Sequence, residues 1–186
     1  MIPMTRPHLE PISVADMKGF LRIDHDEDDE LLHMLIVAAR VMVEAKTARF
    51  LLQQTWRFIL DRWPSGRVIS IPLRPLIGLS EAWVMDQDRK LISIPKTSFS
   101  VDTLADPGRL IQVDPVLDPA PAQGGIMLDV HIGYGATREE VPMPLRQAIR
   151  MLAAYWFENR GDVLSQRSEL PPGVVALLSP FSPVRL

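Results

Sequence analysis

Apolar residues recur at helical spacing just after an acidic run over residues 24–30. The recurring positions are Leu31, Leu32, Leu35, Ala38, Ala39, Met42 and Ala45, and Ile36, Val37, Val41 and Val43 widen the stripe. The acidic residues at the start, with Lys46 and Arg49 near the end, complement the dipole of a helix. The pattern predicts a helix over residues 27–50.

From Gln54 onward the period of the pattern changes to two. Short segments rich in β-branched and aromatic residues alternate with Pro, Gly and Asp, which predicts a series of strands over residues 54–135. Residues 86–90 have the composition of a hairpin loop. In the strand near residue 130, Asp129 and His131 alternate with apolar residues, so we expect one of its faces to be wet.

The last quarter of the chain is more apolar than one small domain requires. A helix over residues 142–161 has a core stripe of Leu145, Ala148, Ile149, Leu152 and Trp156. Met151, Ala153, Tyr155 and Phe157 extend its apolar arc past the usual width of about 100°. We therefore expect other protein surfaces to pack against this helix on two sides. The tail over residues 170–186 then carries apolar residues between prolines. We interpret helix and tail as surfaces for other subunits.

These elements predict an α+β fold in one domain over residues 1–186. A helical bundle begins at Ser13, whose spacing to Asp16 indicates a capping box, and its first part spans residues 13–50. A β-rich block interrupts the bundle, the helix over 142–161 completes it, and an extended tail follows. The 17 prolines indicate short, sharply ended elements.

Composition narrows the class of protein. A net charge of −3 argues against a protein that grips nucleic acid by its phosphates. The chain has no cysteine, which removes disulfides, thiolate metal ligands and cysteine nucleophiles. It shows neither a signal-peptide pattern nor an apolar run of the roughly 20 residues that a membrane helix requires. We therefore expect a soluble intracellular product.

Residues with candidate chemistry do not assemble into a recognisable motif. The acidic run begins with the spacing of an EF-hand loop, but Asp29 stands where Gly is needed and Leu35 where Glu is needed. The four histidines show no metal-binding spacing. Gly133 and Gly135 lack the third glycine and the lysine of a phosphate loop. We predict no catalytic, cofactor or metal site.

Several segments, in this order, resemble the head–tail connector (adaptor) proteins of tailed phages and gene transfer agents. They are the acidic helix start leading to LLHMLIVAARVMVEAKTARFLLQQTW, the connector PLRPL, and the run from IGYG to VPMPLRQAIRMLAAYWFENRGD, with LPPGVVALLSPF closing the chain. The resemblance covers most of the chain. Residues 103–125 are its least typical part.

The resemblance implies a non-enzymatic structural protein that requires no cofactor. Copies would form a homo-oligomeric ring, twelvefold, beneath the portal protein in the neck of a virion or gene transfer agent particle. The ring would extend the channel, let DNA pass without specific binding, and carry the stopper and tail proteins. A ring requires heterologous contacts, in which two different surfaces of each subunit meet.

The two helices and the tail supply the expected contact residues. For contacts between subunits we expect Leu35, Met42, Arg146, Arg150, Met151, Tyr155 and Phe157. For contacts with the portal, the resemblance implies Leu170, Pro171, Leu177, Leu178, Phe181, Val184, Arg185 and Leu186.

Three alternatives stay open at this level. The tail could fold back on its own core. The chain could be another particle component, such as a stopper or tail terminator. It could also be a small-ligand-binding α+β domain, which a buried His/Asp pair or a bound metal would favour.

Overall fold

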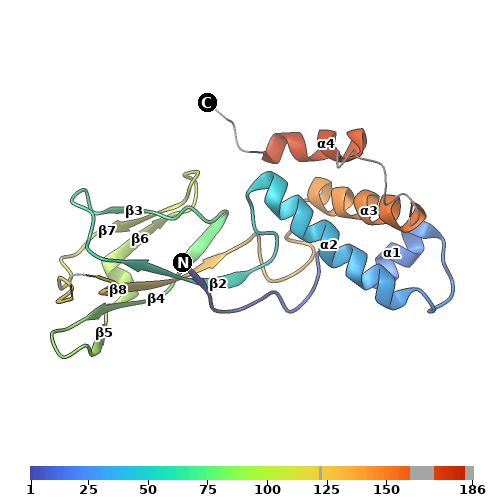
Figure 1. Cartoon of the computed structure of the whole chain (residues 1–186). Helices are drawn as coiled ribbons and strands as arrows, with labels where there is room; N and C mark the ends of the chain where they lie inside the picture. The colour runs from blue at the N-terminus through green and yellow to red at the C-terminus, as the bar shows by residue number, and fades with distance from the viewer. Residues whose placement is uncertain (122, 160–169, 183–186) are drawn as a thin grey trace. The chain divides into compact units, whose positions relative to one another are not determined.

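A computed structural model describes residues 1–121, 123–159 and 170–182 of the chain. The chain divides into two compact units, and each is discontinuous in sequence. The β unit comprises Met1–Pro7 and Gln53–Gly135, and the helical unit comprises His8–Leu52 and Ala136–Leu186. Figure 1 shows the strands gathered in the first unit and helices α1 to α4 in the second. The predicted α+β class is confirmed.

Helix α1 (Val14–Leu21) begins at the predicted capping box. The backbone N–H of Asp16 donates to Ser13 Oγ at 3.0 Å, and the backbone N–H of Ser13 donates to Asp16 Oδ2 at 3.0 Å. These bonds satisfy donors that the first turn of a helix leaves without partners. The helix ends at Arg22, whose left-handed backbone (φ 59°) turns the chain away.

Helix α2 (Asp29–Thr47) covers most of the helix predicted over residues 27–50. It buries one stripe at helical spacing, formed by Leu32, Ile36, Ala39, Val43 and Thr47. The helix ends at Ala48, which has a left-handed φ of 52°. The predicted end at residue 50 is therefore too late by about one turn. Among the described residues, no helix is both long and apolar enough to cross a membrane.

Helix α3 (Met143–Glu158) is packed against the other three helices of its unit. Four of the five residues predicted for its core stripe are buried, and Trp156 is half-buried. Ala153 and Ala154 are buried as well, so the apolar arc is as wide as predicted. The described residues end at 159, so the last two positions of the predicted helix lie outside them.

The beginning of the tail differs from the extended segment that we expected. Pro172–Leu178 form helix α4, and Ser179–Phe181 add a turn of 3-10 helix, η2. Pro171 and Pro172 occupy the cap and the first helical position, where the missing N–H has no helical partner to lose. Proline there starts a helix, so the expectation of an extended tail was wrong over residues 172–181.

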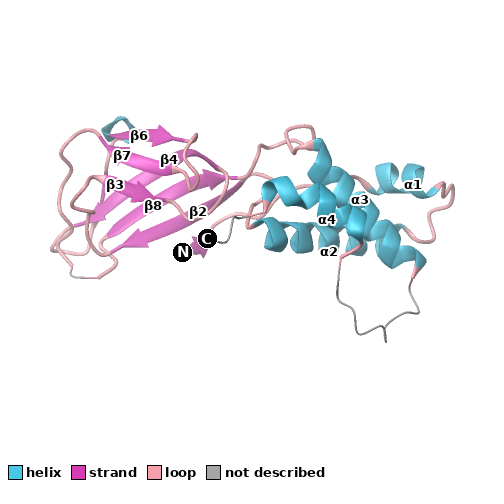
Figure 2. Cartoon of the chain, turned by 90° about the horizontal axis from the view of Figure 1, so that it is seen from above, coloured by secondary structure: helices cyan, strands magenta, loops and turns pink. Residues whose placement is uncertain are grey.

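The β unit contains two antiparallel sheets, drawn in magenta in Figure 2. The five-stranded sheet has the order β1-β2-β8-β4-β5, formed by Ile2–Pro3, Gln54–Leu60, Ile126–Ile132, Leu76–Met85 and Leu91–Ser93. The three-stranded sheet has the order β3-β7-β6, formed by Val68–Ser70, Arg109–Gln112 and Phe99–Asp102. A single 3-10 turn, η1 (Lys96–Ser98), precedes β6.

Strand β8 is central and pairs with β2 on one side and β4 on the other. Its predicted alternation is present, because Ile126, Leu128, Val130 and Ile132 are all buried. The face that we expected to be solvent-exposed is largely covered, because His131 is half-buried and Asp129 is 7% exposed. The predicted loop at residues 86–90 joins β4 to β5, and Asp86 Oδ1 accepts the backbone N–H groups of Asp88 and Lys90 there.

Candidate assembly surfaces

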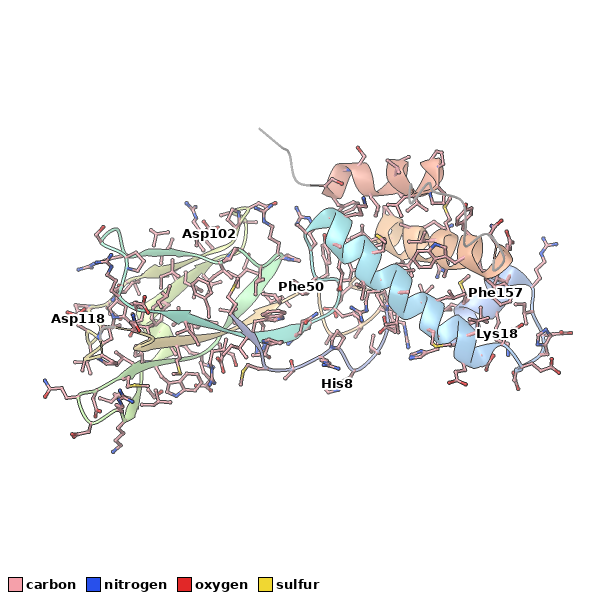
Figure 3. All side chains as sticks on the ribbon, in the orientation of Figure 1. His8, Lys18, Phe50, Asp102, Asp118 and Phe157 are labelled. Atoms are coloured by element: carbon pink, nitrogen blue, oxygen red, sulfur yellow. The ribbon has the colours of Figure 1, made fainter. Side chains whose placement is uncertain are left out.

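The acidic run before α2 forms ion pairs within the helical unit. Lys18 of α1, labelled in Figure 3, pairs with Asp29 at 2.9 Å and with Asp26. These contacts join α1 to the start of α2, where the helix dipole also favours acidic residues. Across the described part of the chain, no group of three or more Asp, Glu or His side chains is placed to hold a metal ion.

A second polar cluster joins the N-terminal segment, α2 and the chain that follows α2. Arg40 Nε donates to Glu10 Oε2 at 2.7 Å, and Arg40 Nη1 donates to Glu44 Oε2 at 2.8 Å. The backbone N–H of Leu51 donates to Glu44 Oε1 at 2.9 Å. Burial raises the pKa of the Glu44 carboxyl, although these donors oppose the shift. The cluster joins the C-terminal half of α2 to the N-terminal segment and to the chain that leaves the helix.

The interface residues predicted on α2 are not its most exposed apolar positions. Leu35 is half-buried and Met42 is 36% exposed. Met34 and Val41 are more exposed, at 54% and 52%, and neither was predicted. At 3.6 residues per turn they lie roughly opposite the buried stripe. The sequence contained this signal, because an apolar stripe wider than one face leaves residues on the far side.

The predicted residues on α3 fall into two groups. Tyr155 is 42% exposed, whereas Arg146, Arg150 and Phe157 are half-buried. Met151 is half-buried beside α4: a Cβ built on Gly173 would lie 2.7 Å from Met151 Cε. Helix α4 of the same chain thus supplies part of the second cover that the width of the apolar arc requires.

The predicted tail residues lie partly inside the fold. Leu178 is buried, and Leu170, Pro171, Leu177 and Phe181 are half-buried. Val184, Arg185 and Leu186 lie outside the described residues. Arg49 Nε donates to the carbonyl of Phe181 at 3.3 Å, which attaches the end of the described tail near the end of α2. Over this stretch the tail folds back on its own unit.

A groove runs beside α4 in the helical unit. Its lining combines apolar side chains with Lys46 and two hydroxyls; it includes Leu170, Pro172, Val175, Ala176 and Ser179. Val175 is 50% exposed, and it points away from the core that its neighbour Val174 enters. The described tail therefore has an inner face that is used within the chain and an outer face that remains accessible.

The β unit has one partly covered polar cluster. Arg57 forms a two-bond ion pair with Asp129, with Nε–Oδ1 at 2.7 Å and Nη2–Oδ2 at 2.8 Å. The Arg57 guanidinium also lies 5.1 Å from the ring centroid of Trp83. The ion pair raises the pKa of Arg57 and explains why Asp129 is buried on the face that we expected to be wet. We interpret this cluster as structural.

The loop from β6 to β7 presents a strongly exposed apolar side chain. Asp102 Oδ1 accepts the backbone N–H groups of Leu104 and Ala105, each at 3.1 Å, and Asp102 Oδ2 accepts from Arg109. The Arg109 guanidinium lowers the pKa of the Asp102 carboxyl. The ordered turn leaves Leu104 97% exposed, so the loop presents an accessible apolar side chain in the β unit.

Comparison with known proteins finds one family whose model matches part of this chain. The model of the phage gp6-like head-tail connector protein family matches residues 11–77. This segment contains α1, α2, the QQTW junction and the PLRPL connector from which the resemblance was inferred. The resemblance to head–tail connector proteins is confirmed. No curated protein matches closely enough to add a further relative.

Solved structures contain chains with the same fold as this chain. One comes from "Virion of native gene transfer agent (GTA) particle", with a TM-score of 0.80, 25% identity, and coverage of 99% of this chain and 95% of that chain. Two others come from "Neck of empty GTA particle computed with C6 symmetry" and "Neck of native GTA particle computed with C12 symmetry". Their TM-scores are 0.81 and 0.79 at 23% and 24% identity, with the same coverage.

Proposed function

We propose that the chain is a structural component of the neck of a phage or gene transfer agent particle. The observation that carries this proposal is a fold shared over 99% of the chain with a chain of a native gene transfer agent virion. The family match to residues 11–77 independently gives the same class from sequence. In this role the protein connects the head to the tail and performs no chemistry.

Within the neck, copies of the chain form a closed ring under the portal protein. Two chains with this fold come from necks computed with C6 and C12 symmetry, and we extend a ring arrangement with twelve copies to this protein. Such a ring encloses a channel, and a net charge of −3 suits a wall past which DNA moves without being held. The opposite side of the ring carries the stopper and tail proteins.

The tail attaches this ring to the portal. Its inner face is anchored within the chain through Val174 and Leu178. The outer face of α4, including Val175 and Ala176, and the end of the tail are the parts that would contact the portal. Because one face of the tail is already anchored within the chain, docking on the portal costs less conformational entropy.

The test is assembly of the full-length chain with purified portal protein, observed by negative-stain electron microscopy and sedimentation velocity. We expect rings that co-sediment with the portal and cap one end of it. A chain that stays monomeric and ignores the portal at micromolar concentration contradicts the proposal. A chain that binds only an already assembled portal–connector complex would instead be a stopper or tail terminator.

A further inference from the structure

The side of α2 that faces away from its core is apolar over three turns. We call it the outer face of α2, and it is formed by Met34, Ala38, Val41, Met42 and Ala45. All five residues are exposed, with Met34 and Val41 each more than half accessible. A helix at the surface of a protein normally places charged and polar residues on this side. The outer face of α2 therefore departs from what solubility alone would favour.

The charged residues of this part of α2 are engaged elsewhere. Arg40 and Glu44 lie on a different side of the helix and bond to each other and to Glu10. Lys46, just beyond the outer face, lines the groove beside α4. The five residues of this face are thus exposed, apolar and uncharged, which is the composition of an interface core.

The described tail does not cover this face. Helix α4 packs mainly on α3, and its buried residues, Val174 and Leu178, point into the helical unit. The end of the tail bonds to Arg49, beyond the last residue of α2. Exposed apolar surface of this extent marks a site that another molecule covers.

We infer that the occupant is a second copy of this chain, and that the outer face of α2 forms one side of the contact between neighbouring subunits. This inference rests on the proposed ring. In a closed ring every copy must bury two different surfaces against its neighbours. Permanent contacts of this kind are more apolar than ordinary surface. The outer face of α2 meets that requirement, and its centre lies at Val41 rather than at Leu35.

Matched substitutions on one helix test the inference. Met34→Glu and Val41→Glu place a charge on the outer face of α2, whereas His33→Glu places the same charge at an exposed neighbouring position outside it. We expect His33→Glu to form rings on purified portal like the wild type. Met34→Glu and Val41→Glu should lower ring formation by about tenfold or more, because a charge is expensive to bury in an interface. All variants should keep the wild-type circular dichroism and unfolding midpoint.

A crosslinking experiment identifies the occupant. The chain has no cysteine, so Val41→Cys and His33→Cys each introduce one site for a maleimide photocrosslinker. In rings assembled on the portal, Val41→Cys should yield a covalent dimer of this chain, and peptide mass spectrometry should locate the complementary surface on the neighbour. The control, His33→Cys, should yield little dimer.

The possible outcomes separate this inference from the proposed ring. If wild-type rings form and the two charged variants assemble normally, the inferred interface is wrong and the ring stands. If Val41→Cys crosslinks to the portal, or to nothing, a second copy is not the occupant. If the wild type never forms rings, with or without portal, the proposed function fails and the inference fails with it.

Discussion

The side chain of Glu44 holds the backbone of Leu51, because the Leu51 N–H donates to Glu44 Oε1 at 2.9 Å. This bond spans the end of α2 and fixes the direction in which the chain leaves the helix. The other carboxylate oxygen accepts from Arg40, which also binds Glu10. One carboxylate therefore organises the end of α2 and, through Arg40, the N-terminal segment.

We expect Glu44→Ala to destabilise the protein by about 1–3 kcal/mol, because it leaves a backbone donor and a guanidinium without their acceptor. Urea unfolding followed by circular dichroism measures the change. Glu139→Ala is the control, since Glu139 is exposed, and it should stay within about 0.5 kcal/mol of the wild type. Equal stabilities of the two variants would show that the cluster contributes nothing to the fold.

Removing the capping box should weaken α1. Ser13→Ala removes the acceptor for the Asp16 N–H and should cost about 1 kcal/mol, whereas Ser13→Thr should retain most of the stability. Thermal unfolding of the three proteins measures this order. An unchanged midpoint for Ser13→Ala would mean that the start of α1 is held by packing alone.

The same cap predicts a pH dependence. Hydrogen bonds from the Ser13 backbone and hydroxyl lower the pKa of the Asp16 carboxyl below its usual value. A carboxylate with a lowered folded-state pKa adds stability above its unfolded pKa and loses it as pH falls through the folded pKa. The stability gap between wild type and Asp16→Asn should therefore shrink below about pH 4. A gap that is constant from pH 7 to pH 3 would contradict this account.

Neighbouring valines on α4 distinguish its two faces. Val174 is fully buried and Val175 is 50% exposed, so Val174→Ala should cost about 1.5 kcal/mol or more and Val175→Ala close to nothing. Urea unfolding monitored by tryptophan fluorescence checks the difference. Co-sedimentation with the portal should show the opposite order, with Val175→Asp weakening it more than Val174→Ala does. If the two alanine variants are equally stable, α4 does not pack as described.

Loss of the Asp129 carboxylate should destabilise the β unit. Asp129→Ala leaves Arg57 without its two hydrogen bonds and should cost about 1–3 kcal/mol. A double-mutant cycle with Arg57→Ala should show a coupling of at least about 0.5 kcal/mol, because the two residues interact directly. Arg62→Ala, at an exposed position, is the neutral control. Additive effects of the two substitutions would contradict a direct interaction.

Sequence periodicity located most of the regular structure. The stripe from Leu145 to Leu152 and the alternation along β8 both arise from burial of one face, which is why the pattern predicted them. Strand pairing was not predictable: β8 pairs with β2 and β4 across long stretches of sequence. No local pattern encodes such partners.

The errors have physical causes. The tail was expected to be extended, yet proline is also suited to the start of a helix, and α4 begins at Pro172. Asp129 read as solvent-facing because the pattern does not show that Arg57 lies beside it across the sheet. On α2, Leu35 was expected at a subunit contact, but it is half-buried, and Met34 and Val41 are the most exposed large apolar residues of the helix.

The two ends of the inserted β segment lie side by side, because the backbone N–H of Gln53 donates to the carbonyl of Gly135 at 2.8 Å. A segment whose ends meet can be lost or exchanged during evolution with little disturbance of the chain on either side. Strand β1 limits that freedom, because Ile2–Pro3 pairs with β2 and would lose its partner. An exchange that keeps the protein intact must therefore replace residues 53–135 and the first few residues of the chain together.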